Sequence, residues 1–154
     1  MASILPIPPN YASTIPYLTI KGAAKAIDFY QKAYGAELIS RMDMPDGAVM
    51  HAEMRIGAAL FMLSEQSDEW CSKSPDMLGD SPVSLMIYVE DVDALVKQAT
   101  AAGAKLSIEV ADQFWGDRSS CLVDPFGHRW MFATHTEDLT DAEIAERAKK
   151  MFGQ

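Results

Sequence analysis

The densest group of side chains that could do chemistry is a pair on one predicted strand. His51 and Glu53 stand two positions apart, so both side chains emerge on the same face of the strand at residues 49–56. Such a pair can act as a base with its orienting carboxylate, or can supply half of a metal site. It can equally be two polar side chains that face water or form hydrogen bonds inside a partly polar cleft.

A second group lies in the predicted loop before a later strand, where Phe114, Trp115, Gly116, Asp117 and Arg118 are consecutive. Aromatic rings beside an acid and a base suit a cleft that holds a flat ligand and fixes its polar end. Asp117 and Arg118 can equally tie the loop to the body. The serines lack the GxSxG context of an activated nucleophile, so a serine nucleophile is unsupported. The sequence alone assigns no catalytic residue.

These groups belong to a pattern that occurs twice. Residues 15–63 and 84–133 each read as a strand, a helix, a glycine turn and three further strands, and Gly57 near the end of the first copy matches Gly127 in the second. Neither copy is long enough to bury both faces of a sheet, so the two must share one core, with a ligand-sized cleft between them. The prediction is one domain over residues 1–154, of the α+β class, built from two βαβββ modules.

Hydrophobic spacing places helices at 23–34 and 91–102, each ended by a glycine. A third helix is expected at about 140–152, because Thr140 and Glu143 have the spacing of a capping box. Its apolar stripe must dock on the body or on another subunit. The proline-rich start predicts an extended arm. The expected strands span residues 17–20, 38–42, 49–56, 59–63, 84–89, 105–110, 119–123 and 129–134.

The overall composition limits the possible partners. The 154 residues are 49% hydrophobic, and the formal net charge of −9 would repel phosphate backbones and anionic lipids. We therefore expect no nucleic-acid partner and no membrane partner. The start MASILPIPPNYAS lacks the basic region and the long apolar stretch of a secretion signal, and the expectation is a cytoplasmic protein.

The two modules resemble a known superfamily. Helix starts of the form IKGAAKAIDFYQKAYG and VEDVDALVKQATAAGAK, with a closing DPFGHRW, resemble the vicinal oxygen chelate superfamily, also called the glyoxalase, bleomycin resistance and dioxygenase superfamily. The strings PDGAVMHAEMRIG, SLMIYVEDVDAL, WGDR and DPFGHRWMF are most similar to its PhnB-like branch. The resemblance implies curved mixed sheets around a cleft, often formed by pairing modules across a homodimer.

For metalloenzymes of this superfamily, the resemblance implies four ligands on the first and last strand of each module, usually His, Gln or Glu. Carried onto this sequence, the four points fall on Ile15, Phe61, Ser84 and Met131. A divalent ion needs three or four nitrogen, oxygen or thiolate donors, which one hydroxyl and one thioether do not provide. We therefore expect no metal and no other cofactor.

The expected function is sequestration of a small-molecule ligand, aromatic or amphipathic, as in the bleomycin-resistance relatives. The alternative is a glyoxalase-like lyase or a dioxygenase with an unorthodox metal site that includes His51 and Glu53. In the expected ligand site Trp115 and Arg118 clamp the ligand, and Phe61 and Met131 form apolar walls. His51 and Glu53 supply hydrogen bonds, and Ser84 adds a hydroxyl.

Overall fold

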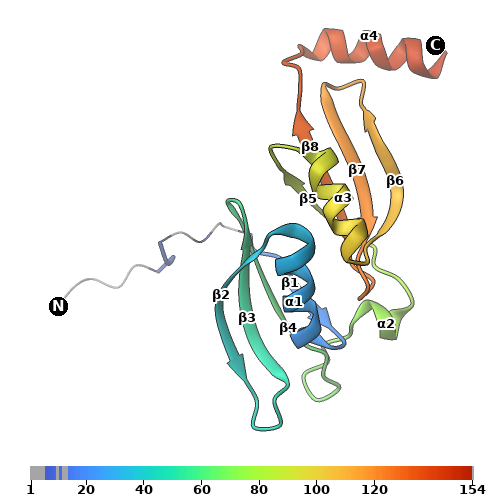
Figure 1. Cartoon of the computed structure of the whole chain (residues 1–154). Helices are drawn as coiled ribbons and strands as arrows, with labels where there is room; N and C mark the ends of the chain where they lie inside the picture. The colour runs from blue at the N-terminus through green and yellow to red at the C-terminus, as the bar shows by residue number, and fades with distance from the viewer. Residues whose placement is uncertain (1–5, 10, 12–13, 154) are drawn as a thin grey trace.

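The computed structural model describes residues 6–9, 11 and 14–153, and it contains two four-stranded sheets that each carry one helix (Figure 1). Residues 1–5, 10, 12 and 13 of the expected N-terminal arm, and residue 154, lie outside the described residues. The first module consists of β1 (Tyr17–Ile20), α1 (Ala23–Tyr34), β2 (Glu37–Asp43), β3 (Val49–Ile56) and β4 (Ala59–Glu65). The second consists of β5 (Ser84–Tyr88), α3 (Val92–Ala102), β6 (Lys105–Asp112), β7 (Asp117–Val123) and β8 (Arg129–His135).

Both sheets have the same mixed topology, which confirms the prediction of an α+β fold with two βαβββ modules. The strand orders are β1-β4-β3-β2 and β5-β8-β7-β6. The first strand of each module runs parallel to the last, and the remaining pairs are antiparallel. In each module the helix supplies the crossover after the first strand, and the later strands follow as hairpins.

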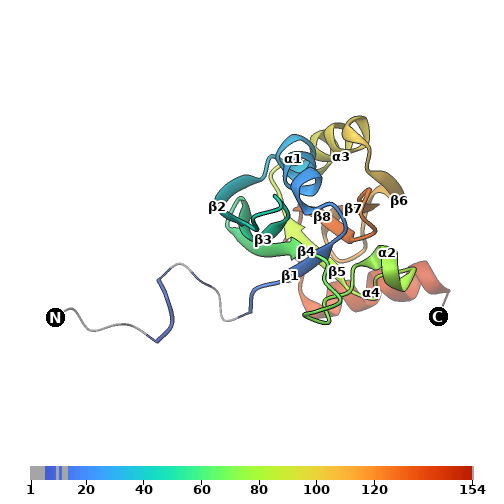
Figure 2. The ribbon, with the colours of Figure 1, turned by 90° about the horizontal axis from the view of Figure 1, so that it is seen from below.

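The two modules meet through their helices, which lie side by side in Figure 2. The side-chain amide of Gln98 on α3 donates to the carbonyl oxygen of Lys32 at the end of α1, at 2.9 Å. Below the helices, aromatic rings from both modules form a shared core, so neither module buries its apolar face alone. The rings belong to Tyr30, Tyr34, Phe61, Trp130 and Phe132.

A buried carboxylate organises this core. One oxygen of Asp124 accepts from the hydroxyl of Tyr30 at 2.7 Å and from the indole nitrogen of Trp130 at 2.9 Å. The other oxygen accepts from the backbone nitrogens of Phe126 and His128, each at 2.9 Å. Four donors therefore compensate the burial of one charge, and they connect α1 to the β7–β8 turn.

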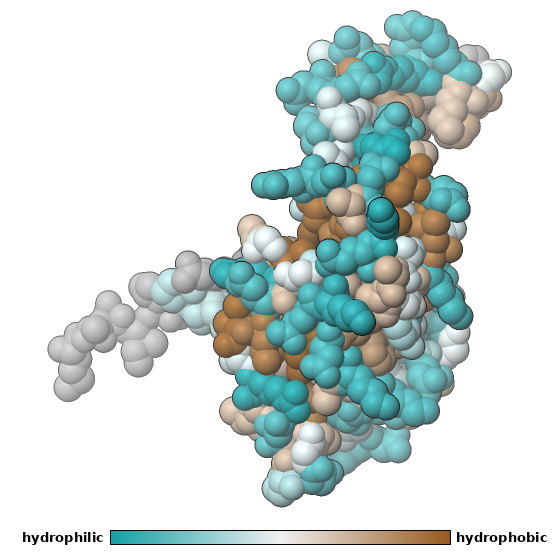
Figure 3. Space-filling view, viewed as in Figure 1, coloured by the Kyte–Doolittle hydropathy of each residue, from teal (hydrophilic) through white to brown (hydrophobic). Residues whose placement is uncertain are grey.

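Two further helices lie outside the modules. The linker contains α2 (Pro75–Leu78), which the sequence analysis did not predict. The C-terminal α4 (Asp141–Phe152) begins with the expected capping box of Thr140 and Glu143. Its surface is mostly hydrophilic in the view of Figure 3, and at its C-terminal end Met151 and Phe152 are each 66% exposed. No helix of the described residues is long and apolar enough to cross a membrane.

Candidate functional site

Each sheet has one face against its helix and a second face that we call the open face. Strand pairing defines which side chains share it. On the first sheet Tyr17 lies opposite Met62, which lies opposite Glu53, and His51 is two positions further along β3. The open face of the second sheet carries the corresponding side chains of β5, β8 and β7, namely Ser84, Met86, Met131 and Cys121.

The predicted pair on β3 belongs to a chain of four polar groups on the first open face. The hydroxyl of Tyr17 lies 2.8 Å from Nδ1 of His51, and Nε2 of His51 lies 3.4 Å from Oε1 of Glu53. The hydroxyl of Tyr11 donates to Oε2 of Glu53 at 2.8 Å. A proton on Nε2 satisfies both imidazole contacts, since Nδ1 then accepts from Tyr17 while Nε2 donates to Glu53. The pair is therefore hydrogen-bonded on a face that a ligand can reach.

Phe61 and Met131 were expected at equivalent positions on the last strands of the two modules, and this expectation is wrong by one residue. Met131 pairs with Met86 on its open face, whereas Phe61 is only 2% exposed and packs between Tyr30 and Trp130 on the helix side. The counterpart of Met131 is Met62.

The cause of this slip is that the two hairpins close at residue pairs on opposite faces. The turn of residues 57 and 58 follows the pair Ile56–Ala59 on the helix side, and Phe61, two positions after Ala59, faces the same way. The turn of residues 124–128 follows the pair Val123–Arg129 on the open face, and Met131 faces that way, so equal counts from the two glycines reach opposite faces.

The strand register shows which side chains occupy the four positions where the superfamily resemblance implies metal ligands. The four points carry Ile15, Met62, Ser84 and Met131, which together offer one hydroxyl and two thioether sulfurs. Such a set does not fit Zn²⁺ or Mn²⁺, which bind imidazole, carboxylate or thiolate ligands. Within the described residues, His, Cys, Asp and Glu form no group of three or more that could hold a metal ion.

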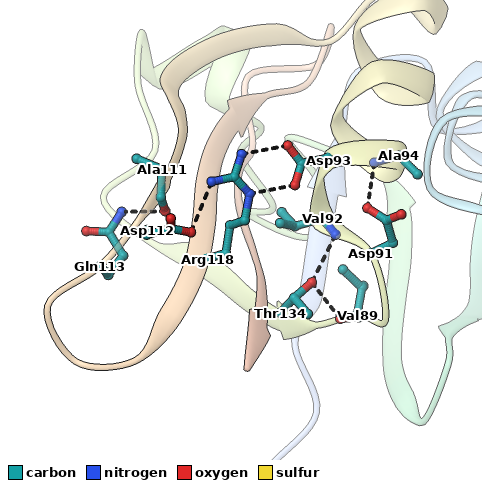
Figure 4. A network of polar contacts seen from close by, with 10 residues as sticks. All are labelled: Val89, Asp91, Val92, Asp93, Ala94, Ala111, Asp112, Gln113, Arg118 and Thr134. Carbon is teal, nitrogen blue, oxygen red and sulfur yellow. Dashed lines mark hydrogen bonds and ion pairs between the residues drawn. The ribbon is translucent and has the colours of Figure 1, made fainter. Parts of the chain in front are cut away.

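Trp115 and Arg118 point to different parts of the molecule, so they do not form the expected common clamp. Arg118 donates to both oxygens of Asp93 on α3, at 2.6 and 2.8 Å, and to Asp112 at 3.0 Å (Figure 4). These ion pairs tie β7 to α3 and to the end of β6. Trp115 instead donates to Asp117 at 3.0 Å, on the open face.

Asp117 is the centre of a second polar network, which the sequence analysis did not predict. Its carboxylate is 3% exposed and accepts from the Tyr88 hydroxyl at 2.7 Å and from Trp115, both at Oδ2. Oδ1 lies 2.9 Å from Nδ1 of His135, whose Nε2 lies 2.9 Å from Asp138. Both ring nitrogens of His135 face carboxylates, so the doubly protonated imidazolium satisfies both contacts.

The pKa values of Asp117 and His135 shift in opposite directions. Burial acts to raise the pKa of Asp117, but hydrogen bonds from His135, Tyr88 and Trp115 outweigh burial and hold this pKa below its usual value. Hydrogen bonds to Asp117 and then to Asp138 raise the pKa of His135 above its usual value. Asp117 is therefore charged above the ordinary pKa of an aspartate, about 4, and His135 is charged below the ordinary pKa of a histidine, about 6.5. The ion pair is fully formed in the pH range between these two values.

Replacing His135 with glutamine should make stability less dependent on pH. The raised pKa of His135 stabilises the folded state below the unfolded-state pKa, and this contribution disappears as the pH rises through the folded-state value. Urea unfolding of wild type and His135→Gln at pH 5.5, 7 and 9 measures the difference, which should be largest at pH 5.5. A difference that does not change with pH would show that the imidazolium is not stabilised in the fold.

Two cavities lie beside these groups. The first, of about 380 Å³, lies at the junction of the modules and brings together the predicted residues Phe61 and Ser84, with Met86 and Trp130. The second, of about 470 Å³, lies between the Asp117 network and the start of α4. The predicted site residues are thus distributed over several places, and His51 and Glu53 lie on the open face of the first sheet.

Comparisons with known proteins agree with the fold. Residues 12–132 match the sequence profile of the glyoxalase/bleomycin resistance protein/dioxygenase superfamily, and the chain belongs to that superfamily. An uncharacterized protein of Mycobacterium tuberculosis, Rv0887c, is 39% identical over 132 residues, which are 84% of this chain and 78% of the relative.

Two solved structures are also similar. TioX from Micromonospora sp. ML1 has a TM-score of 0.64 at 25% identity, with 84% of this chain and 100% of TioX covered. A PhnB protein from Bacillus cereus has a TM-score of 0.60 at 18% identity, with 80% and 99% covered, and shares the fold.

Proposed function

We propose that this protein is a metal-free small-molecule binding protein of the bleomycin-resistance type, in the PhnB-like branch of its superfamily, and that it sequesters an aromatic or amphipathic ligand. The observation that carries the proposal is the donor set at the four strand positions, where Ile15, Met62, Ser84 and Met131 replace metal ligands. Thioether and hydrocarbon surfaces suit an apolar ligand. The hydrogen-bonded groups beside them can fix its polar end.

The proposal includes a cytoplasmic homodimer. Apolar side chains remain exposed on both open faces, among them Tyr17 and Met42 of the first sheet and Met86 and Ile108 of the second. Exposed apolar side chains that gather on one face of a sheet are typical of an interaction site. A partner subunit that placed its second sheet over the first sheet of this chain would cover both faces and close a cleft, and light scattering of the purified protein measures the expected dimer.

A thermal-shift screen of aromatic and amphipathic compounds in the presence of EDTA tests ligand binding. A ligand at one hundred times its Kd should stabilise the protein by about 2.7 kcal/mol, because it binds the folded state alone. Met86→Glu should abolish the rise in Tm, since it places a charge on the open face beside the junction cavity.

The matched control is Met77→Glu on α2, because Met77 and Met86 are each 43% exposed. This control should keep the full rise in Tm. Screening in which no compound stabilises the wild type, or in which both variants respond like the wild type, would contradict the proposed site.

A further inference from the structure

The cavity of about 470 Å³ beside α4, which we call the terminal cavity, is separate from the four strand positions. Its walls come from β5, from the loop before β7, from the end of β8 and from the start of α4. Tyr88 and Trp115 form the aromatic part of the lining, and Leu139 and Ile144 form an apolar part. None of Ser84, Met86 and Met131 lines it. It therefore offers a binding surface of its own.

The two aromatic rings are held in place by one atom. The hydroxyl of Tyr88 and the indole nitrogen of Trp115 both donate to Oδ2 of Asp117, and both residues line the cavity. Donation to a carboxylate makes an aromatic ring more electron-rich. Electron-rich rings attract a cation to their faces. Preorganised rings also bind at a lower entropic cost than mobile ones.

The charges around the cavity favour a cation over an anion. Three carboxylates line it, from Asp117, Glu137 and Asp138, and they outnumber the one cationic group of the lining, the imidazolium of His135. Asp117 and one oxygen of Asp138 are occupied by His135, and Glu137 forms an ion pair with Arg147 at 2.7 Å.

The second oxygen of Asp138 has no hydrogen-bond partner among the residues that the structure describes. It remains able to accept from a ligand. An anionic ligand would meet the three carboxylates and a chain with a net charge of −9.

We propose that the terminal cavity binds an organic cation, a quaternary or protonated amine on an apolar body. The ammonium group lies against Tyr88 and Trp115 and near Asp138, and the apolar body packs on Leu139 and Ile144. This inference goes beyond the proposed function, because the terminal cavity is separate from the junction cavity and from the four strand positions. The aromatic walls distinguish the site from a plain acidic surface, because they attract only ligands that bring a cation or an apolar face into contact.

Matched probes test the charge requirement. Calorimetric titration of the full chain with benzyltrimethylammonium should give saturable binding. Choline should bind about tenfold more tightly than its neutral isostere 3,3-dimethylbutan-1-ol, as expected for a cation against aromatic faces. Added sodium chloride should weaken binding of the cations and leave the alcohol unaffected.

Variants locate the site. Trp115→Leu should abolish binding of benzyltrimethylammonium, whereas Trp70→Leu in the exposed part of the linker should not change it. Asp138→Asn keeps the shape of an exposed side chain and should weaken the cations while leaving the alcohol unchanged. Asp138→Asn also tests the site on its own if the Trp115 variant does not fold.

The possible outcomes separate this inference from the proposed function. Equal affinity for choline and its isostere, or unchanged cation binding in both Trp115→Leu and Asp138→Asn, would overturn the cation site. A neutral compound that stabilises the protein while no cation binds would overturn the cation site and leave the proposed function intact. Failure of every compound, cations included, would overturn both.

Discussion

Replacing Asp124 with alanine is expected to lower the free energy of unfolding by about 3–5 kcal/mol. The substitution leaves four donors without their acceptor in the shared core, among them the Tyr30 hydroxyl and the Trp130 indole nitrogen. Each unsatisfied buried donor costs about 1–3 kcal/mol. Urea unfolding followed by circular dichroism measures the loss, and Asp28→Ala on the exposed face of α1 is the control, with an expected change within about 0.5 kcal/mol.

Two stacked tyrosines provide a matched test of the same network. The rings of Tyr30 and Tyr34 stack 5.7 Å apart, but only the hydroxyl of Tyr30 donates to Asp124. The hydroxyl of Tyr34 is buried and has no hydrogen-bond partner within the part of the chain that the structure describes. Tyr30→Phe should therefore destabilise the protein, whereas Tyr34→Phe should be neutral or stabilising. Equal losses in the two variants would show that Asp124 does not organise the core.

Gly116→Ala should lower the free energy of unfolding by about 3 kcal/mol. Gly116 has a φ of +93°, and a Cβ placed there would lie 2.5 Å from the carbonyl oxygen of Glu137. Two separate costs combine, the left-handed backbone conformation and the clash with another backbone segment. Because Thr136 and Glu137 both donate to the carbonyl oxygen of Gly116, the clash should also separate the Trp115 loop from the start of α4.

Gly47→Ala is the control for the backbone conformation alone. Gly47 has a φ of +86°, and a Cβ there would meet no atom within 4 Å. Its expected cost is about 1–2 kcal/mol, and the tryptophan emission spectrum should not change. A Gly116 variant that is no less stable than the Gly47 variant would contradict the close contact between the loop and residue 137.

Local sequence patterns predicted most of the fold because each element has its own signal. The alternation in β3 predicted its bounds and placed His51 and Glu53 on one face, and the capping box predicted the start of α4. The ends of β6 and β7 were less accurate: β7 begins at Asp117, two residues earlier than expected. The β6–β7 pairing contains two register irregularities, which displace the strand ends and which periodicity alone does not reveal.

The contacts that define the site join residues far apart in the chain, which is why they were missed. Tyr88 reaches Asp117 from a strand 29 residues away, and Tyr11 reaches Glu53 from 42 residues away. Glu65 similarly accepts from the backbone nitrogens of Gly22 and Ala23 at the start of α1. These partners depend on which strands become neighbours. The one available signal was alternation on β5, which places Tyr88 on the same face as Met86.

The most direct test of the account is a calorimetric titration with one ligand from the thermal-shift screen. The ligand is titrated into protein dialysed against EDTA, and separately into the same protein supplied with Zn²⁺ or Mn²⁺. Metal-free binding predicts the same Kd in all three titrations, because the side chains at the four strand positions are not metal ligands. Loss of binding in EDTA and recovery with either cation would contradict the account and would favour a metalloenzyme whose site includes His51 and Glu53.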